Sequence, residues 1–249
     1  IDRVVVLGDI CKGTGTAAEY AFAKEFFRRI PQPLRVVAGN HDFLYEDEPD
    51  GEGRKVKAPA TVRRQKLARF VETFGLAAAS SAERLGGYLL VYLSPDDLES
   101  GLLVKLSDER LAWLARTLAD HAALPTIVFF HAPLAGTLTP YNERVNTPSF
   151  IAQPRDRLAE LLQQNPQVFL WAAGHLHVPA TKPDFHSPVN VYDGRVTVVH
   201  NTDLERKHTW TNVLYLSPDK VLVRTYDHRH GAWLPDRERV IRPPLRRGP

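Results

Sequence analysis

The sequence predicts an α/β fold, a four-layer α/β/β/α sandwich of two mixed β-sheets flanked by helices. Two observations predict it. Four short runs, at residues 4–7, 34–38, 126–130 and 168–173, are mainly apolar, which is typical of strands covered on both faces of a sheet. Helical patterns separate the strands in the first two thirds of the chain, whereas only strands follow in the last third.

The elements of the first half follow from these patterns in chain order. Apolar runs predict strands at 3–8 and 34–38, and the segment at about 16–29 between them predicts a helix. A polar loop that contains Gly and Pro then extends to about residue 59. A helix is expected after it, at about 61–74.

The second half is expected to begin with strands at 87–93 and 102–105, followed by a helix at 107–121 and a strand at 126–130. A loop at 132–150, rich in Pro, Thr and Asn, comes next. A helix at 154–164 and a strand that ends at Gly174 follow it. Stretches of alternating apolar and polar residues at 188–200, 210–217 and 220–227 predict an antiparallel second sheet. No internal repeat or low-complexity segment interrupts this order.

Length and composition fit one ordinary globular domain over residues 1–249. Of the 249 residues, 43% are hydrophobic and 24% are charged, and the formal net charge is only +3. Because acidic and basic residues are interspersed, a nucleic-acid-binding surface is not expected. No apolar stretch reaches the length of a membrane span. Cys11 is the only cysteine, so an intrachain disulfide is excluded, and we expect a cytoplasmic protein.

Side chains that bind metals follow each of the four apolar runs. They stand in the segments Gly8-Asp9, Gly39-Asn40-His41-Asp42, His131 and Gly174-His175-Leu176-His177. A glycine at a strand exit lets the backbone turn and approach a ligand closely, so we expect the side chains to converge. Each has an ordinary alternative when taken alone: Asp9 could cap the next helix, and the histidines could be loop residues.

Together and in this order, the four segments resemble the ligand blocks of the calcineurin-like metallophosphoesterases. The helix expected at 106–114 resembles the one that precedes the lone-histidine strand in that family. The stretch from Trp113 to His177 is similar to the cyclic-nucleotide and glycerophosphodiester phosphodiesterase branch. The family's first block, Asp-x-His, does not precede Asp9 in this sequence, and we expect that block and its strand upstream of Ile1.

The resemblance implies a site for two divalent transition-metal ions, Mn, Fe or Zn, because its ligands mix nitrogen and oxygen. Asp9 would bridge the two ions. One ion would also bind Asn40, His131 and His175. The other would also bind His177 and the upstream ligands.

His41 and Asp42 are implied as catalytic residues. His41 would stabilise the transition state or protonate the leaving group. Asp42 would accept one imidazole N–H of His41 and so fix its orientation.

The predicted function is hydrolysis of a phosphomonoester or phosphodiester through a hydroxide that bridges two metals. Two cations about 3.5–4 Å apart can activate water, neutralise phosphate charge and assist the leaving oxygen. The expected substrate is a small phosphoester or a phosphoprotein. The alternative is a non-catalytic protein-binding module with the same fold and an incomplete metal site.

Two long loops, at 43–60 and 132–150, are expected to select the substrate, because they leave ligand-bearing strand ends. The candidate contacts are Tyr45, Arg54, Lys55, Tyr141, Asn142 and Arg144. Basic clusters at 54–57 and 63–66 could attract phosphate or simply be solvated. The histidines at 186, 200, 208, 228 and 230 match no family block and are expected at the surface or in supporting positions.

Overall fold

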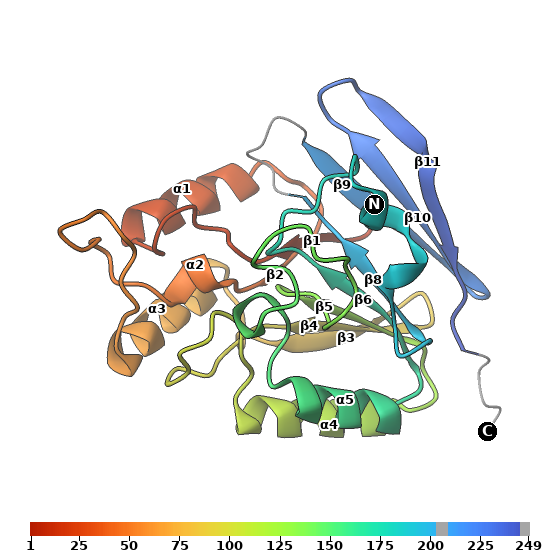
Figure 1. Ribbon diagram of the computed structural model, residues 1–249, viewed down its shortest axis with the longest axis horizontal. Coiled ribbons are helices and arrows are strands. Elements are labelled where there is room, and N and C mark those ends of the chain that lie inside the picture. The colour runs from red at the N-terminus through yellow and green to blue at the C-terminus, as the bar shows by residue number, and fades with distance from the viewer. Residues whose placement is uncertain (203–208, 245–249) are drawn as a thin grey trace.

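The computed structural model describes residues 1–202 and 209–244 and is built around a mixed sheet of six strands (Figure 1). The strand order is β3-β4-β5-β6-β8-β7, made of β3 (Ser81–Leu85), β4 (Tyr88–Leu93), β5 (Thr126–Phe130), β6 (Val168–Ala173), β7 (Val191–Tyr192) and β8 (Val196–His200). The four inner strands run parallel, and the two edge strands pair antiparallel. The carboxyl ends of β4, β5, β6 and β8 therefore share one edge of the sheet.

A second layer of strands packs on this sheet and consists of two separate sheets. One is the parallel pair β1 (Val4–Leu7) and β2 (Leu34–Val37). The other is antiparallel, in the order β11-β10-β9, made of β9 (Trp210–Ser217), β10 (Lys220–Asp227) and β11 (Ala232–Ile241). Buried apolar side chains such as Phe129, Val37 and Val223 fill the space between the layers, so burial of these faces holds the layers together.

Helices cover the outer face of the six-stranded sheet and that of the β1–β2 pair, as Figure 1 shows. Helices α4 (Asp108–Asp120) and α5 (Arg155–Gln164) pack leucines against the six-stranded sheet. Helices α1 (Ala17–Phe27) and α3 (Ala60–Thr73) pack against β1 and β2 through residues such as Tyr20 and Phe70.

Short helices complete the chain. They are α2 (Asn40–Phe43) and the 3₁₀ turns η1 (Pro148–Phe150), η2 (Pro183–His186) and η3 (Pro188–Asn190). Helix α2 begins directly after β2 and carries residues predicted to form the site. Among the described residues, no helix has the length and apolar character needed to cross a membrane.

The predicted α/β class is confirmed, with helices and strands interleaved as expected, but several assignments are wrong. Residues 102–105 do not form a strand, since Lys105 makes only an isolated bridge with Gln153. The stretch 188–200 was expected in the second sheet. It contains η3, β7 and β8, and β8 pairs parallel with β6 in the first sheet. Only 210–217 and 220–227 pair in the antiparallel sheet predicted for them.

Two edge strands were missed because their sequences are polar. Strand β3 carries Glu83 and Arg84, and β11 contains Pro235 and several charged residues. Charges and proline are typical of edge strands, where they prevent pairing with other chains, and they obscure the apolar alternation that predicts a strand.

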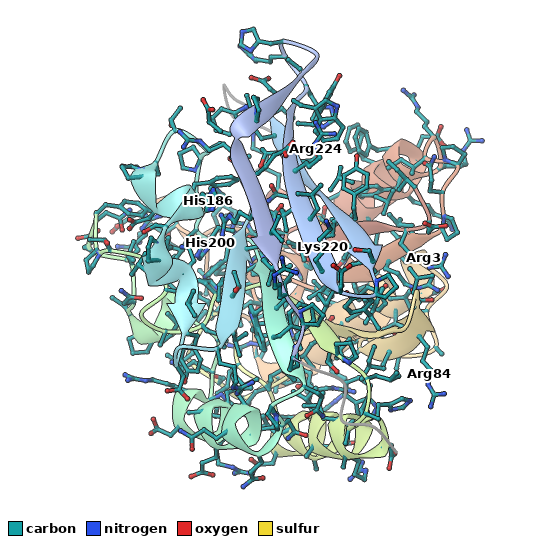
Figure 2. All side chains as sticks on the ribbon, turned by 90° about the vertical axis from the view of Figure 1, so that its right-hand side faces the viewer. Arg3, Arg84, His186, His200, Lys220 and Arg224 are labelled. Carbon is teal, nitrogen blue, oxygen red and sulfur yellow. The ribbon has the colours of Figure 1, made fainter. Side chains whose placement is uncertain are left out.

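Glu83 links the two strand layers through hydrogen bonds from three side chains. Its carboxylate accepts from Arg3 Nε at 2.9 Å, Arg35 Nη2 at 2.9 Å and Tyr92 Oη at 2.8 Å. Arg3 precedes β1 and Arg35 lies on β2, whereas Tyr92 lies on β4. Figure 2 shows Arg3 and Arg84 on the same flank of the molecule, where these strands meet. Burial raises the pKa of Glu83, but the bonds from Arg3, Tyr92 and Arg35 outweigh it and lower the pKa to about 2.

We predict that Glu83→Gln lowers the free energy of unfolding by about 1–3 kcal/mol at neutral pH, the range for hydrogen bonds to a charged group. The folded-state pKa is about 2 and lies below the ordinary value of 4.5, so this stability is present above about pH 4.5 and is lost as pH falls toward 2. The measurement is urea unfolding of both proteins at several pH values.

The exposed pair of Glu25 with Arg28 provides the control, since Glu25→Gln should change stability little. A difference between wild type and Glu83→Gln that stays constant down to pH 3 would contradict the assignment.

Candidate metal centre

The site forms where β1, β2, β5 and β6 end. His131, directly after β5, lies 2.6 Å from Leu7 O at the end of β1 through its Nδ1. The backbone N–H of Gly174, directly after β6, donates to His131 O at 2.9 Å. His131 therefore joins strand ends from both layers, and the segments that carry the predicted ligands meet around it.

Three predicted ligands form one compact group. Asp9, His131 and His175 each offer a ligand atom, and these atoms all lie within 4.8 Å of one another. The Asp9 carboxylate approaches His131 Nε2 to 3.2 Å through Oδ2 and accepts a hydrogen bond from the His41 backbone N–H at 2.9 Å through Oδ1. This mixed set of nitrogen and oxygen donors suits a transition-metal ion.

Neighbouring groups orient the ligand atoms. His131 Nδ1 faces Leu7 O, and His175 Nε2 faces Ser149 O at 3.1 Å. The amide Nδ2 of Asn40 donates to the Tyr45 hydroxyl at 3.2 Å. The atoms of these side chains that remain for a metal ion are His131 Nε2, His175 Nδ1 and Asn40 Oδ1, as in protein metal sites where supporting hydrogen bonds fix the ligands.

Two buried atoms show that the donors fit a cation. In the described part of the chain, Asn40 Oδ1 and His131 Nε2 are buried and have no hydrogen-bond partner. A buried polar atom without a partner costs free energy, and a metal ion would satisfy both atoms.

Electrostatics favour a cation at the same place. Burial raises the pKa of Asp9, but the charges of His131 and His41 outweigh it and hold the pKa below its ordinary value. Burial and the neighbouring His131 lower the pKa of His175 to about 3, so His175 is neutral, as a metal ligand must be. An anionic Asp9 beside a neutral His175 is a donor set ready for a metal ion.

The backbone at the ligands is unusual. Asp9, His175 and His177 have positive φ angles of 51°, 63° and 49°, in the left-handed region that residues with a side chain seldom adopt. Such conformations cost free energy and cluster at functional sites. They turn the chain at the strand ends and present these side chains to the site.

His177 lies at the wall of the site, outside the compact group. It lines a pocket of about 290 Å³ together with Asp9, Asn40, His41, Tyr45, Leu103, Arg144, Phe150 and His175. The structure thus brings all five predicted ligands to one place: three in the compact group, and Asn40 and His177 at the pocket that it borders.

His41 also faces this pocket. Its Nε2 lies 4.0 Å from Asp9 Oδ2, and its Nδ1 lies 2.8 Å from Gly13 O and 2.7 Å from Lys55 Nζ. Glu19 holds the loop that presents Gly13 O, because its carboxylate accepts backbone N–H groups from Gly13 to Thr16.

The expectation that Asp42 orients the His41 imidazole is wrong. The Asp42 carboxylate accepts instead from the backbone N–H groups of Cys11 at 2.9 Å and Gly39 at 2.7 Å. It is fully buried, and this burial and the nearby Asp9 raise its pKa to about 7. Asp42 therefore fastens the loop after β1 to the start of α2, and Gly13 takes the position at His41 that was predicted for Asp42.

The basic clusters have different roles from those expected. Arg63 is buried and donates to backbone carbonyls, including Ala58 O at 2.6 Å and Ser100 O at 2.7 Å. Lys66 is also buried and donates to Thr14 O at 2.8 Å and Tyr45 O at 2.6 Å. Both residues anchor loops around the pocket. Of the segment 54–57, Lys55 reaches the site, at His41.

His200 is not at the surface, which was one of the two positions expected for it. It is completely buried at the end of β8, and its Nε2 lies 3.2 Å from Thr137 O. Burial lowers the pKa of His200 to about 3. Figure 2 shows His200 beside β8 and His186 near it on η2. His200 supports the loop at 132–150, which is the other position that the sequence allowed for it. His208 lies outside the described residues.

Sequence reasoning missed the groups that orient the ligands. Gly13 and Ser149 act through backbone carbonyls, which carry no sequence signal. Leu103 and Phe150 line the pocket without belonging to any ligand block. Tyr45 was expected to contact substrate, and its bond to the Asn40 amide was not foreseen. The feature of the sequence that could have indicated this bond is the position of Tyr45, five residues after Asn40 and two residues beyond the end of α2.

We predict that Gly39→Ala weakens metal binding by about 10- to 100-fold, the loss typical when a metal site's surroundings are disturbed. A Cβ at Gly39 would collide with the Asp9 carboxylate and lie 2.8 Å from His131 Cε1. The φ of Gly39 is −111°, which alanine adopts readily, so the effect is steric and local. Metal content after dialysis against Mn or Zn is the measurement.

Gly101→Ala is the matched control, because a Cβ there meets nothing within 4 Å. This variant should hold as much metal as wild type. Equal metal content in Gly39→Ala and wild type would show that the ligands do not converge beside Gly39.

Comparison with known proteins agrees with this geometry. A family model described as calcineurin-like phosphoesterase matches residues 1–179. The chain is 27% identical over 185 residues to a probable glycerophosphodiester phosphodiesterase, GpdQ, from Arcobacter nitrofigilis. The alignment covers 72% of this chain and 58% of that protein, so the chain spans less than two thirds of that relative's length.

Two solved structures have a similar fold. One is a dimetal phosphatase from Danio rerio, with a TM-score of 0.64 and 15% identity over 98% of this chain and 84% of that chain. The other is GAP50 of Plasmodium, described as the anchor in the inner membrane complex, with a TM-score of 0.53 and 10% identity over 99% and 80% of the two chains. Such identities show a shared fold alone. Because the family model covers most of the chain and the fold agrees, the protein belongs to the calcineurin-like phosphoesterase family.

Proposed function

We propose that the protein is a metal-dependent phosphoesterase with a site for two divalent ions. The observation that carries the proposal is the pair of buried, unpartnered ligand atoms, Asn40 Oδ1 and His131 Nε2, beside the Asp9 carboxylate. When bound, two such ions supply Lewis acidity toward phosphate oxygens and lower the pKa of water. The relatives are consistent with this chemistry, since one is named as a phosphodiesterase and one as a dimetal phosphatase.

The chain's own residues have distinct roles in this proposal. Asn40, His131 and His175 hold one ion, each fixed by its own supporting hydrogen bond. Asp9 would be a ligand of both ions, because its carboxylate faces the compact group and the open pocket. His177, at the pocket wall, would help to hold the second ion.

His41 is the proposed general acid. Its backbone N–H donates to Asp9 Oδ1, and its Nδ1 lies 2.8 Å from Gly13 O and 2.7 Å from Lys55 Nζ, so both its backbone and one ring nitrogen are held. Its Nε2 is left facing the pocket near Asp9. A proton on Nε2 can pass to a leaving oxygen of a substrate whose phosphoryl group lies beside Asp9.

A non-catalytic binding module is the weaker alternative. Such a module needs neither unpartnered ligand atoms at the end of a buried strand nor left-handed backbone at three ligand positions. These features cost free energy, and a metal site gives them a use.

Metal-dependent hydrolysis tests the proposal. We expect the chelated, dialysed protein to be inactive toward bis-p-nitrophenyl phosphate, and addition of Mn or Zn to restore turnover. Asp9→Asn keeps the shape of the ligand but removes its charge, so it should reduce turnover to near background. Asp156→Asn, on the exposed first turn of α5, is the control and should keep wild-type turnover. A protein that binds metal but hydrolyses no phosphoester would favour the binding module.

We predict that His41→Ala slows hydrolysis of alkyl esters by about 10²–10⁴-fold and slows nitrophenyl esters much less. Nitrophenolate leaves without a proton, whereas an alkoxide needs one. Rates for the two ester types are compared at saturating metal, and metal content is measured on the same samples. Equal losses on both ester types would assign His41 to phosphate positioning.

A further inference from the structure

A series of neighbouring flat side chains runs from the predicted ligands His131 and His175, whose ring planes are tilted by 55°, to one side of the pocket. The His131 and His175 rings lie 4.7 Å apart. Phe150 stacks on His175 with ring centroids 4.9 Å apart and an interplanar angle of 20°. The guanidinium of Arg144 then lies over the Phe150 ring, with Cζ 5.6 Å from its centroid. Phe150 therefore contacts both His175 and Arg144, and Arg144 is the last member of the series.

The backbone of Arg144 is fixed by hydrogen bonds, whereas its guanidinium is not. Its backbone N–H donates to Asn142 Oδ1 at 2.9 Å, and its carbonyl accepts from Thr147 Oγ1 at 2.8 Å. Over residues 1–202 and 209–244, its guanidinium makes neither a hydrogen bond nor an ion pair, although it lines the pocket. This cation is thus available to a group that enters the pocket.

The remaining wall is mostly apolar. Leu103 and Tyr45 line it. The Tyr45 hydroxyl accepts the Asn40 amide hydrogen, and the backbone carbonyl of Tyr45 accepts from Lys66. Apart from Arg144, the predicted metal ligands and His41, the side chains that line the pocket therefore offer few free hydrogen-bonding groups for a polyol such as glycerol. A flat unsaturated ring needs few such groups and gains from contact with these surfaces.

We propose that Arg144 is a specificity-determining residue that stacks on a flat ring of the substrate, in a phosphodiester whose non-leaving substituent is an aryl or nucleobase-bearing group. The proposal rests on the proposed function, because it places the phosphoryl group at Asp9 and His41. A guanidinium plane is a suitable partner, since arginine stacks on flat rings and on bases. The contact with the Phe150 ring positions the guanidinium beside the pocket.

The opposing reading is that Arg144 binds a second anionic group through its N–H edge. The variant Arg144→Lys distinguishes these two interpretations. Lysine keeps the positive charge but has no plane, so it cannot replace a stacked guanidinium, whereas it can still attract an anion.

The test compares two diesters with the same leaving group and charge, thymidine 5′-(p-nitrophenyl phosphate) and methyl p-nitrophenyl phosphate. We expect wild type to prefer the thymidine ester in kcat/KM by about 5- to 150-fold, the range that corresponds to stacking of one base. Arg144→Ala and Arg144→Lys should both bring the ratio close to one, mainly through KM. Arg157→Ala, an exposed arginine on α5, is the control and should keep the wild-type ratio.

A wild-type ratio near one, or a ratio that Arg144→Lys preserves, would overturn the proposal. If neither diester is hydrolysed at any metal loading, the proposed function fails, and calorimetry then tests the subsite alone. Thymidine 5′-monophosphate should bind the metal-loaded protein more tightly than methyl phosphate, and Arg144→Lys should remove the difference. Equal affinity of wild type for the two phosphates would remove the subsite as well.

Discussion

The contact between His131 and the end of β1 is the interaction on which the site depends. His131 Nδ1 lies 2.6 Å from Leu7 O, and its Nε2 lies 3.2 Å from Asp9. One ring thus connects β5 in the six-stranded sheet to β1 in the second layer. Because the ring is buried, its position is set by the packing of both layers, and the metal-binding atoms move only if the layers move.

The loops around the site are held by groups that satisfy backbone polar atoms. The carboxylates of Glu19 and Asp42 accept backbone N–H groups, and the side chains of Arg63 and Lys66 donate to backbone carbonyls. Buried backbone groups need such partners, and fixing them removes freedom from the loops. The result is a rigid rim around Asp9 and His41, which a site must have to hold ligand atoms in place.

The two sides of the pocket are built from different kinds of segment. The ligand side is built from strand ends and is anchored in both layers. The other side belongs to connections, with Tyr45 and Leu103 on one wall and Arg144 and Phe150 on the other. Connections vary more easily than sheets, so this arrangement lets the chain change its substrate preference without disturbing the metal ligands.

The sequence by itself determined the α/β class, the four longer helices α1, α3, α4 and α5, and the strands β1, β2, β4, β5 and β6, because apolar period and length are local properties. It also determined which residues meet at the strand ends, since each ligand follows an apolar run. Only the tertiary structure decided how β8 and β11 pair and where β3 lies, because pairing partners are distant in sequence and polar edge strands lack an apolar pattern. It also decided that the Asp42 carboxylate accepts hydrogen bonds from backbone N–H groups, while the carbonyl oxygen of Gly13 lies beside the His41 ring. A carboxylate accepts hydrogen bonds from the donors that the fold places beside it. One donor to Asp42 is the backbone N–H of Cys11, which is 31 residues away in the chain.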